Sequence, residues 1–265
     1  MERSKIKICV MRVGGTNRDT DVARCLEDQG AIVETLHLND ILRRRNLGTY
    51  QGLVFPGGFA YGDYIRAGAI WGKKIEAFLK DDLKLFVEAR KPILGICNGF
   101  QVLVEAGLLP EVSFTPPEFA LASNNSGKFE CRWVSLRKNE KSNCVFTKDL
   151  KDVVKFPVAH GEGRFVALNA TLMETLSRNN QIALQYALPD GQPANQKYPE
   201  NPNGSVMDAA GVCSNSGTVF GLMPHPENAY WGYEMPDWTE RREIPPSGDG
   251  IGIFKSMVDY IEQAL

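Results

Sequence analysis

A cysteine between two glycines has the setting in this sequence that most clearly predicts chemistry. Gly95-Ile-Cys97-Asn-Gly99 lies between an apolar run at 92–96 and a helical pattern over 98–106. This strand–turn–helix order is the nucleophile-elbow arrangement with Cys in place of Ser. A helix N-terminus and a nearby imidazolium both favour the thiolate, which is the reactive form of a cysteine. We therefore predict that Cys97 is a nucleophile.

A histidine and a glutamate two positions apart could supply the matching base. His225 directly follows an apolar run at 218–222, and Pro224 and Pro226 stiffen the chain on either side of it. In an extended chain, His225 and Glu227 point to the same side. The carboxylate can then bond one ring nitrogen, fix the tautomer and stabilise the imidazolium. We predict that His225 transfers protons and that Glu227 orients it.

A second glycine-rich turn could stabilise the negative charge that forms during attack on an amide. Pro56-Gly57-Gly58 follows the apolar run at 52–55. Adjacent glycines let backbone N–H groups approach a ligand closely. We assign the N–H groups of Gly58 and Asn98 to an oxyanion hole, where one donor typically contributes about 100- to 1000-fold in rate. A tight turn without any ligand is the alternative.

The elements that must position these residues alternate between strand and helix patterns in the first half of the chain. Strands are expected at 6–13, 31–38, 52–55 and 92–96, and helices at 19–28, 70–89 and 98–106. The alternation indicates βαβ units and a parallel sheet covered on both faces. The predicted fold class is therefore α/β, a flavodoxin-like, doubly wound, mostly parallel sheet with a nucleophile elbow. Loops at the carboxyl ends of such strands converge on one crevice, which would bring Cys97 and His225 together.

The second half of the chain has a less regular pattern. Strands are expected at 129–136, 153–158, 182–186 and 218–222, and an amphipathic helix is expected at 251–265. Two polar stretches rich in Pro, Gly and Asn, at 188–204 and 236–250, are expected to be surface loops because regular patterns resume after each. Length alone permits one or two domains. We predict a single domain over residues 1–265.

Charge and hydropathy exclude several classes of function. The net charge of -2 and the pI near 6.0 argue against nucleic-acid binding, which needs a basic surface. The first 13 residues have no long apolar stretch behind their charges, so they predict a strand and not a signal peptide. No window approaches the roughly 18 apolar residues of a membrane span. We expect a cytoplasmic chain without a membrane or nucleic-acid partner, with its six cysteines as free thiols.

Five motifs together resemble the class I, or triad, glutamine amidotransferases. They are PGGFAYGDYIRAG at 56–68, GICNGFQ at 95–101, AHGEGRF at 159–165, NPNGS at 201–205 and MPHPE at 223–227. The Asn after the nucleophile and the AHGEGRF segment favour the branch that serves de novo purine synthesis over those for guanine, tryptophan or pyrimidine synthesis. The resemblance implies that Cys97, His225 and Glu227 form the triad.

The resemblance also implies a set of residues in the glutamine pocket or on the face toward a synthetase. This set comprises Gly57, Phe59, Gln101, His160, Glu162, Arg164 and Asn203. Asn201, Asn203 and Ser205 are expected to form an ordered loop at the same interface. Two pairings stay open for Glu162 and Arg164, which could pair with each other or with the partner subunit.

The reaction that the resemblance implies is hydrolysis of L-glutamine through a cysteine thioester, with ammonia passed to a partner. The implied partners are a large synthetase subunit and a small bridging subunit. This sequence has no phosphate-cradling Gly-Lys-Ser/Thr loop and no evident carboxylate cluster for Mg²⁺. We therefore expect neither a cofactor nor a metal on this chain, and we expect ATP and Mg²⁺ on the synthetase subunit.

Several alternatives fit parts of the pattern. Flavodoxin-like cysteine hydrolases of the intracellular peptidase and deglycase kind typically place a His directly after the nucleophile, where this chain has Asn98. An inactive regulatory subunit would usually lack one of the three triad residues, which are all present. A Ser-type α/β hydrolase fits poorly, because its acid precedes its His in the chain. Cys97 could also be a buried structural cysteine beside two turn glycines.

Overall fold

A nine-stranded sheet runs through the computed structural model, which describes residues 1–114, 117–240 and 242–265. The strand order is β2-β1-β3-β4-β11-β10-β9-β6-β7. The first five strands in this order pair in parallel, and they are β2 (Ile32–His37), β1 (Lys7–Arg12), β3 (Gly52–Phe55), β4 (Ile93–Ile96) and β11 (Val219–Leu222). This half matches the predicted parallel sheet.

The other half of the sheet is built from antiparallel pairs. Its strands are β10 (Ala209–Cys213), β9 (Ile182–Ala187), β6 (Glu130–Lys138) and β7 (Val153–His160). Because each of these pairs reverses direction, β9 and β7 run the same way as the five parallel strands, and only β10 and β6 oppose them. A separate two-stranded sheet joins β5 (Phe119–Ala122) to β8 (Arg164–Ala167).

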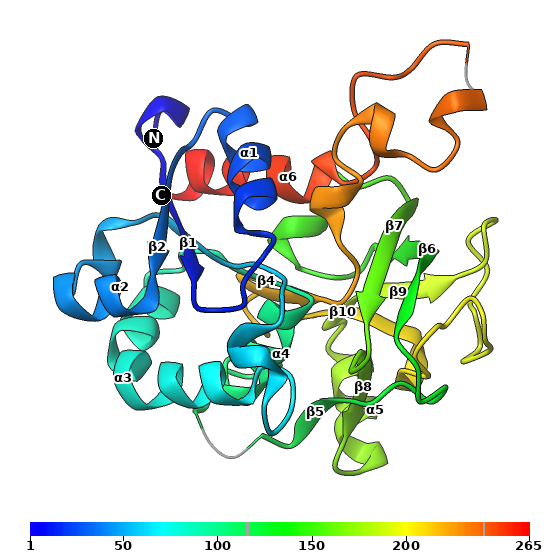
Figure 1. Cartoon of the computed structure of the whole chain (residues 1–265), viewed down its shortest axis with the longest axis horizontal. Helices are drawn as coiled ribbons and strands as arrows, with labels where there is room; N and C mark the ends of the chain where they lie inside the picture. The colour runs from blue at the N-terminus through cyan, green and yellow to red at the C-terminus, as the bar shows by residue number, and fades with distance from the viewer. Residues whose placement is uncertain (115–116, 241) are drawn as a thin grey trace.

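Helices cover both faces of the parallel half, as Figure 1 shows. The helices of the described chain are α1 (Asp19–Asp28), α2 (Leu38–Arg44), α3 (Ala69–Glu88), α4 (Asn98–Glu105), α5 (Ala170–Arg178) and α6 (Ile251–Ala264). α1 packs against α6 on one face, and α3 packs against α4 on the other. The predicted α/β, doubly wound class is therefore confirmed.

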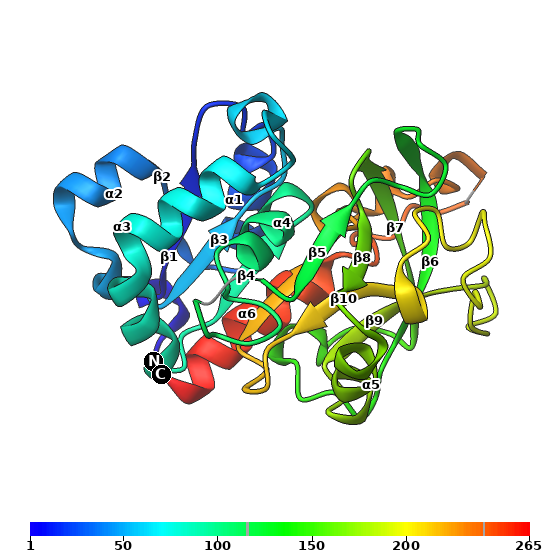
Figure 2. The ribbon, with the colours of Figure 1, turned by 90° about the horizontal axis from the view of Figure 1, so that it is seen from below.

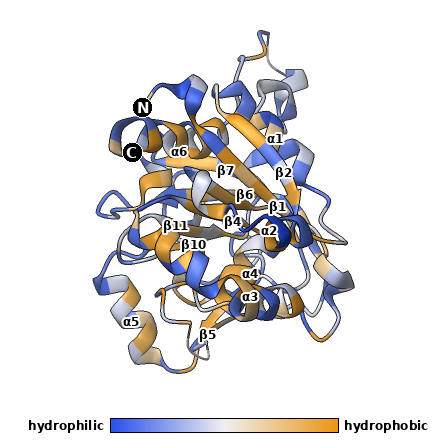
Figure 3. Cartoon of the chain, turned by 90° about the vertical axis from the view of Figure 1, so that its left-hand side faces the viewer, coloured by the Kyte–Doolittle hydropathy of each residue, from blue (hydrophilic) through white to orange (hydrophobic). Residues whose placement is uncertain are grey.

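The apolar core follows from this two-sided cover. β3 and β4 are buried along their whole length, because helices shield them on both faces. In Figure 3 the central strands are mostly apolar, whereas α2, which lies against the edge strand β2, is hydrophilic. The two chain ends lie side by side in Figure 2. They are joined by a hydrogen bond of 2.6 Å from the N-terminal amine to the Glu262 carbonyl.

The structure contains elements that the sequence patterns did not predict. These are the strands β5, β8 and β10 and the helices α2 and α5. β5 and β8 are partly exposed and contain alanine or arginine among their apolar residues, and β10 is a run of small residues. None of the three therefore stands out as a strongly apolar run or as a clear alternation. The stretch 188–204 contains neither helix nor strand, as predicted, and residue 241 of the second expected loop lies outside the described residues.

Three of the predicted site segments follow directly from the carboxyl ends of parallel strands. β3 leads into Pro56, β4 into Cys97 and β11 into Met223. The edge strand β7 also reaches this region, since the Pro157 carbonyl accepts a 2.8 Å hydrogen bond from the His225 N–H. The antiparallel half therefore curls back toward the elbow. In the described part of the chain, no helix is both long and apolar enough to cross a membrane.

Candidate active site

Cys97 occupies a sharp turn between β4 and α4, with φ 51° and ψ −107°. A non-glycine residue pays for such a positive φ with local strain, which the surrounding packing must hold in place. A Cβ on Gly99 would lie 1.9 Å from the Phe55 carbonyl oxygen, and one on Gly95 would lie 2.6 Å from Leu103. Both glycines are therefore required, because α4 packs too closely against β3 at Gly99 and against β4 at Gly95 for a side chain.

His225 and Glu227 are in direct contact. The Nδ1 atom of His225 lies 2.7 Å from Oε1 of Glu227, and both side chains are buried. The expectation of an extended chain is wrong here, because Pro226–Asn228 form a turn of 3₁₀ helix. Proline at the first position of the turn favours it. The turn still brings the two side chains together, and the Pro157 carbonyl fixes the backbone of His225.

The other ring nitrogen of His225 has no hydrogen-bond partner among the described residues. Burial lowers the pKa of His225, but the Glu227 carboxylate and the sulfur of Cys97 outweigh it and raise this pKa to about 10. The imidazole of His225 is therefore close enough to Cys97 for electrostatic attraction between the imidazolium and the thiolate. The geometry does not reach that of a hydrogen bond. Catalytic hydrogen bonds are often looser before substrate binds.

Cys97 lines a cavity of about 130 Å³, although its side chain is 95% buried. The lining residues are Gly58, Phe59, Asp63, Ala67, Cys97, Gln101, Phe129, Ala159, His160, Gly161 and Glu162. The sulfur also lies 3.7 Å from the carbonyl oxygen of Ala159, at the end of β7. Five residues of the predicted pocket set and oxyanion hole, Gly58, Phe59, Gln101, His160 and Glu162, therefore share one cavity with the elbow.

The N–H of Gly58 is directed away from its neighbouring chain segment. Thr16 and Gly58 form an antiparallel bridge that is held by the flanking bonds Phe59 N to Gly15 O and Asn17 N to Gly57 O. In a pair held by flanking bonds, the N–H groups of the paired residues point outward. Gly58 is also one of the residues that line the cavity. Gly57 lies beneath the imidazole of His225, where a Cβ would come within 2.9 Å of the ring.

The side chain of Asn98 ties the two predicted oxyanion loops together. Its Oδ1 accepts a 3.1 Å hydrogen bond from the Ala60 N–H, and its Nδ2 donates to Gln101 at 2.9 Å and to Asp63 at 3.4 Å. The backbone N–H of Asn98 belongs to the first turn of α4, where such groups lack intrahelical partners. Asn98 thus holds the 58–63 loop against the elbow.

Of the two pairings left open for Glu162 and Arg164, the one between these two side chains is absent among the described residues. Glu162 accepts a 3.1 Å hydrogen bond from the Ala67 N–H, and its carbonyl accepts one from Gln101 at 2.6 Å. Arg164 instead donates to the Asn125 side chain at 2.9 Å. Arg164 does not line the cavity, so the structure separates it from Gln101 and Glu162.

His160 is held in one tautomer by two asparagines. Asn124 uses its amide hydrogens on the His160 and Lys128 carbonyls, so its oxygen accepts from Nδ1 of His160 at 3.1 Å. Nε2 of His160 then accepts from Asn203, which also donates to the Tyr186 hydroxyl at 3.0 Å. Burial, reinforced by the positive charge of His225, lowers the pKa of His160 to about 4. His160 is therefore neutral at pH 7.

The NPNGS segment lies inside the molecule and not on its surface. Asn201, Asn203 and Ser205 are all at most 1% exposed. Ser205 accepts from the Phe165 N–H and donates to the Asn203 side chain, which joins the segment to β8. Asn203 thus contacts the His160 ring but does not itself line the cavity.

Five cavity residues carry no separate assignment from the sequence, namely Asp63, Ala67, Phe129, Ala159 and Gly161. Asp63 and Ala67 fall inside the first motif, and Ala159 and Gly161 inside the third, so the motifs gave the segments but not these roles. Phe129 stacks on Phe59 with ring centroids 6.4 Å apart, a contact between residues far apart in the chain. No local pattern around Phe129 could have predicted it.

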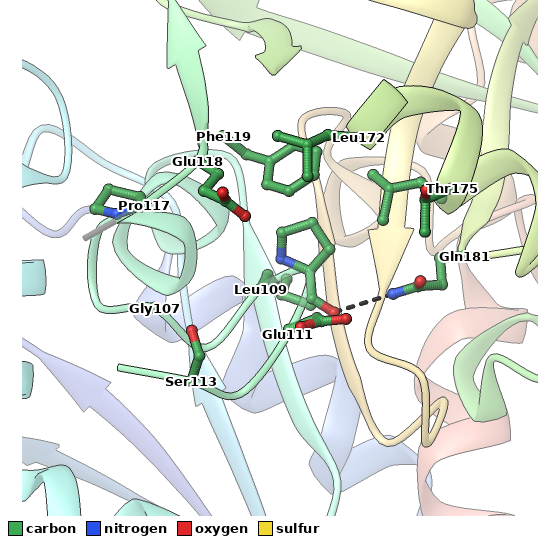
Figure 4. A pocket seen from close by; sticks show the side chains of 12 residues that line it. Gly107, Leu109, Glu111, Ser113, Pro117, Glu118, Phe119, Leu172, Thr175 and Gln181 are labelled. Atoms are coloured by element: carbon green, nitrogen blue, oxygen red, sulfur yellow. Dashed lines mark hydrogen bonds between the residues drawn. The ribbon is translucent and has the colours of Figure 1, made fainter. Parts of the chain in front are cut away.

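A second cavity, of about 150 Å³, lies apart from this chemistry (Figure 4). Its lining includes Pro110, Phe119 and two residues of α5, Leu172 and Thr175. Gln181, which also lines it, donates to the Pro110 carbonyl at 3.0 Å. Neither Cys97 nor any other residue of the Cys97 cavity lines it. Across the described chain, no group of three or more His, Cys, Asp or Glu side chains could hold a metal ion.

A parallel sheet whose elbow presents a cysteine beside a His–Glu pair defines an α/β protein of the nucleophile-elbow class. The model of the CobB/CobQ-like glutamine amidotransferase domain matches residues 5–261. Phosphoribosylformylglycinamidine synthase subunit PurQ of Archaeoglobus fulgidus is 46% identical, over 99% of this chain and 100% of that protein. The corresponding PurQ of a Methanococcus maripaludis strain is 40% identical, over 97% of this chain and 98% of that protein.

A solved structure agrees with these relatives. The structure of PurLQS from Thermotoga maritima contains a chain that is 33% identical, with a TM-score of 0.72 over 97% of this chain and 99% of that one. The chain belongs to the PurQ family of glutamine amidotransferases.

Proposed function

We propose that this chain is the glutaminase subunit of phosphoribosylformylglycinamidine synthase and hydrolyses L-glutamine to glutamate and ammonia. The observation that carries the proposal is the elbow itself, where Cys97 lines a small cavity beside the buried His225–Glu227 pair. A cavity of about 130 Å³ suits a single small substrate. Family membership adds glutamine as that substrate.

The first step is attack on the side-chain amide. The Cys97 thiolate forms an S–C bond with the amide carbon, and the carbonyl oxygen becomes an oxyanion. The N–H groups of Gly58 and Asn98 are the proposed donors to that oxyanion. Their support comes from the outward direction of the Gly58 N–H and from the place of Asn98 at the start of α4. Such donors act without reorganising, since the fold already fixes them.

The next steps depend on the charge of His225. Its raised pKa keeps the imidazolium present at neutral pH, so a proton is available for the departing nitrogen. The C–N bond breaks, ammonia leaves, and Cys97 retains a glutamyl thioester. The imidazole, now neutral, takes a proton from water, which attacks the thioester carbon. The C–S bond breaks, glutamate leaves, and the thiolate–imidazolium pair is restored.

The ammonia must reach a second active site before it is protonated in water. We infer that the chain docks on a synthetase subunit, with a small bridging subunit, where ammonia converts formylglycinamide ribonucleotide to formylglycinamidine ribonucleotide. The PurLQS structure of the Thermotoga relative supports such an assembly. ATP and Mg²⁺ are assigned to the synthetase, and no cofactor is assigned to this chain. We place the assembly in the cytoplasm, with the other enzymes of purine synthesis.

Covalent labelling with an electrophilic glutamine analogue tests the proposal. We expect mass addition at Cys97, and protection by L-glutamine. Cys131 is the matched internal control, because it is the exposed cysteine and should react with a general alkylating agent but not with the analogue. Labelling at another cysteine, or none at all, would instead support a hydrolase of another kind or an inactive binding subunit.

A further inference from the structure

The Cys97 cavity carries an imbalance of charge that the mechanism does not use. Two carboxylates line it, those of Asp63 and Glu162, and no lysine or arginine is among its described lining residues. His160 is neutral, because burial lowers its pKa to about 4. The imidazolium of His225 serves Cys97 and Glu227 and is not part of the lining.

Asp63 is the less satisfied of the two carboxylates. Glu162 accepts a 3.1 Å hydrogen bond from the Ala67 N–H, whereas Asp63 accepts only a long 3.4 Å bond, from Asn98, within the described residues. No ion pair neutralises Asp63 in the part of the chain that the structure describes, since the nearby Arg66 is paired with Glu105. Burial, together with the charge of Glu162, raises the pKa of Asp63 to about 6. A partly buried carboxylate in this state is stabilised by an incoming cation.

The substrate of the proposed function brings such a cation. L-glutamine carries an ammonium group at the end opposite its side-chain amide. Cys97 identifies this cavity as the substrate site independently of its charges, and it fixes where the amide must lie. A ligand that fills so small a cavity contacts most of its lining residues, which include Asp63 and Glu162.

We propose that Asp63, supported by Glu162, binds the α-ammonium group of L-glutamine and selects substrates that carry it. The proposal rests on the glutaminase function proposed above. Asn98 connects the proposed ammonium site to the nucleophile. Its side chain donates to Asp63, and it is the first residue of α4, next to Cys97. The α-carboxylate of the substrate is repelled by the same two carboxylates and therefore points away from them.

Turnover of glutamine and of glutaramate by the D63N variant, in complex with the synthetase subunit, tests this role. Glutaramate is glutamine without its ammonium group, and asparagine keeps the shape of Asp63 and can still accept from Asn98. We expect D63N to lower kcat/KM for glutamine by roughly 10- to 100-fold, mainly through a higher KM, because a charge-assisted contact is lost. For glutaramate we expect kcat/KM to stay within about threefold. D81N, which removes an exposed charge on α3, is the matched control.

The possible results separate the role of Asp63 from the glutaminase function itself. Equal losses for both substrates with normal alkylation of Cys97, or an unchanged KM for glutamine, would overturn the role of Asp63. If D63N fails to fold, D63E replaces it as the test, since a retained carboxylate must retain the preference for glutamine over glutaramate. A wild-type complex that hydrolyses neither substrate would contradict the proposed function itself, and not this assignment.

Discussion

His225 shows how two buried partners control the charge of one side chain. Burial alone would keep its imidazole neutral, yet the carboxylate of Glu227 and the sulfur of Cys97 raise its pKa to about 10. The second carboxylate oxygen of Glu227 has no hydrogen-bond partner among the described residues. The hydrogen bond between the first oxygen and His225 is therefore the main polar interaction of this carboxylate. His225 is consequently charged across the neutral range, where it can both favour the thiolate and supply a proton.

Replacing Glu227 by glutamine should shift the pH dependence of the reaction. Without the carboxylate, the pKa of His225 falls, because burial then opposes the charge with one less anion nearby. The imidazolium exists only below this pKa, so the basic limb of kcat/KM should move to lower pH in E227Q. We also expect a loss of roughly 100-fold or more near neutral pH.

The measurement is kcat/KM for glutamine as a function of pH, with E174Q on the exposed face of α5 as control. A basic limb that stays in place in E227Q would show that Glu227 does not set the charge of His225.

At the scale of elements, the close approach of α4 to β3 creates the elbow. The missing side chain at Gly99 lets the Phe55 carbonyl come within 1.9 Å of where a Cβ would stand. Alanine at this position must push α4 away from β3, and with it the strained residue Cys97. The elbow is therefore a packing feature as much as a turn.

We expect G99A to lower the free energy of unfolding by about 3 kcal/mol, since neither backbone segment can give way without loss of packing. G48A is the matched control, because a Cβ at Gly48 meets no atom within 4 Å, and we expect it to stay within about 0.5 kcal/mol of wild type. Urea denaturation followed by circular dichroism measures both. Equal stability of the two variants would refute the close-packing argument.

The sequence predicted those elements whose pattern is local and periodic. The parallel strands, α1 and α4 all fall where the apolar runs and helical spacing placed them. β5 and β8 were not predicted because both are partly exposed and contain alanine or arginine, unlike the fully buried strands β3, β4 and β11 of the same length. They also pair with each other across a long stretch of chain. The 3₁₀ turn after His225 was also not predicted, because the flanking prolines are compatible with both extended and turn geometry.

The same reasoning explains which site residues could be predicted. Cys97, His225 and Glu227 stand in short motifs that carry their own chemistry. The support of His160 by Asn124, and of Asn203 by Tyr186, depends on contacts between distant segments that no local pattern encodes. Asp63 lies inside one of the motifs, but the role proposed for it depends on the absence of lysine and arginine from the described lining of the cavity.

At the scale of the whole molecule, the antiparallel half of the sheet completes the site. β7 lies at the opposite edge of the sheet from β2, yet its end supplies Ala159 and His160 to the cavity and holds the backbone of His225. Two of the lining residues, Phe59 and Phe129, are large apolar side chains that are exposed to solvent. We expect the isolated chain to be a poor glutaminase, because the partner that receives ammonia is absent.

The most direct test of the account is to quench the complex with acid during glutamine turnover and determine the mass of the Cys97 peptide. We expect a glutamyl adduct on Cys97 that hydroxylamine releases and that the C97S variant lacks. The rate of turnover should also be higher in the complex than for the isolated chain. Steady hydrolysis with Cys97 unmodified, or undiminished hydrolysis by C97S, would contradict the central claim that this sulfur attacks glutamine.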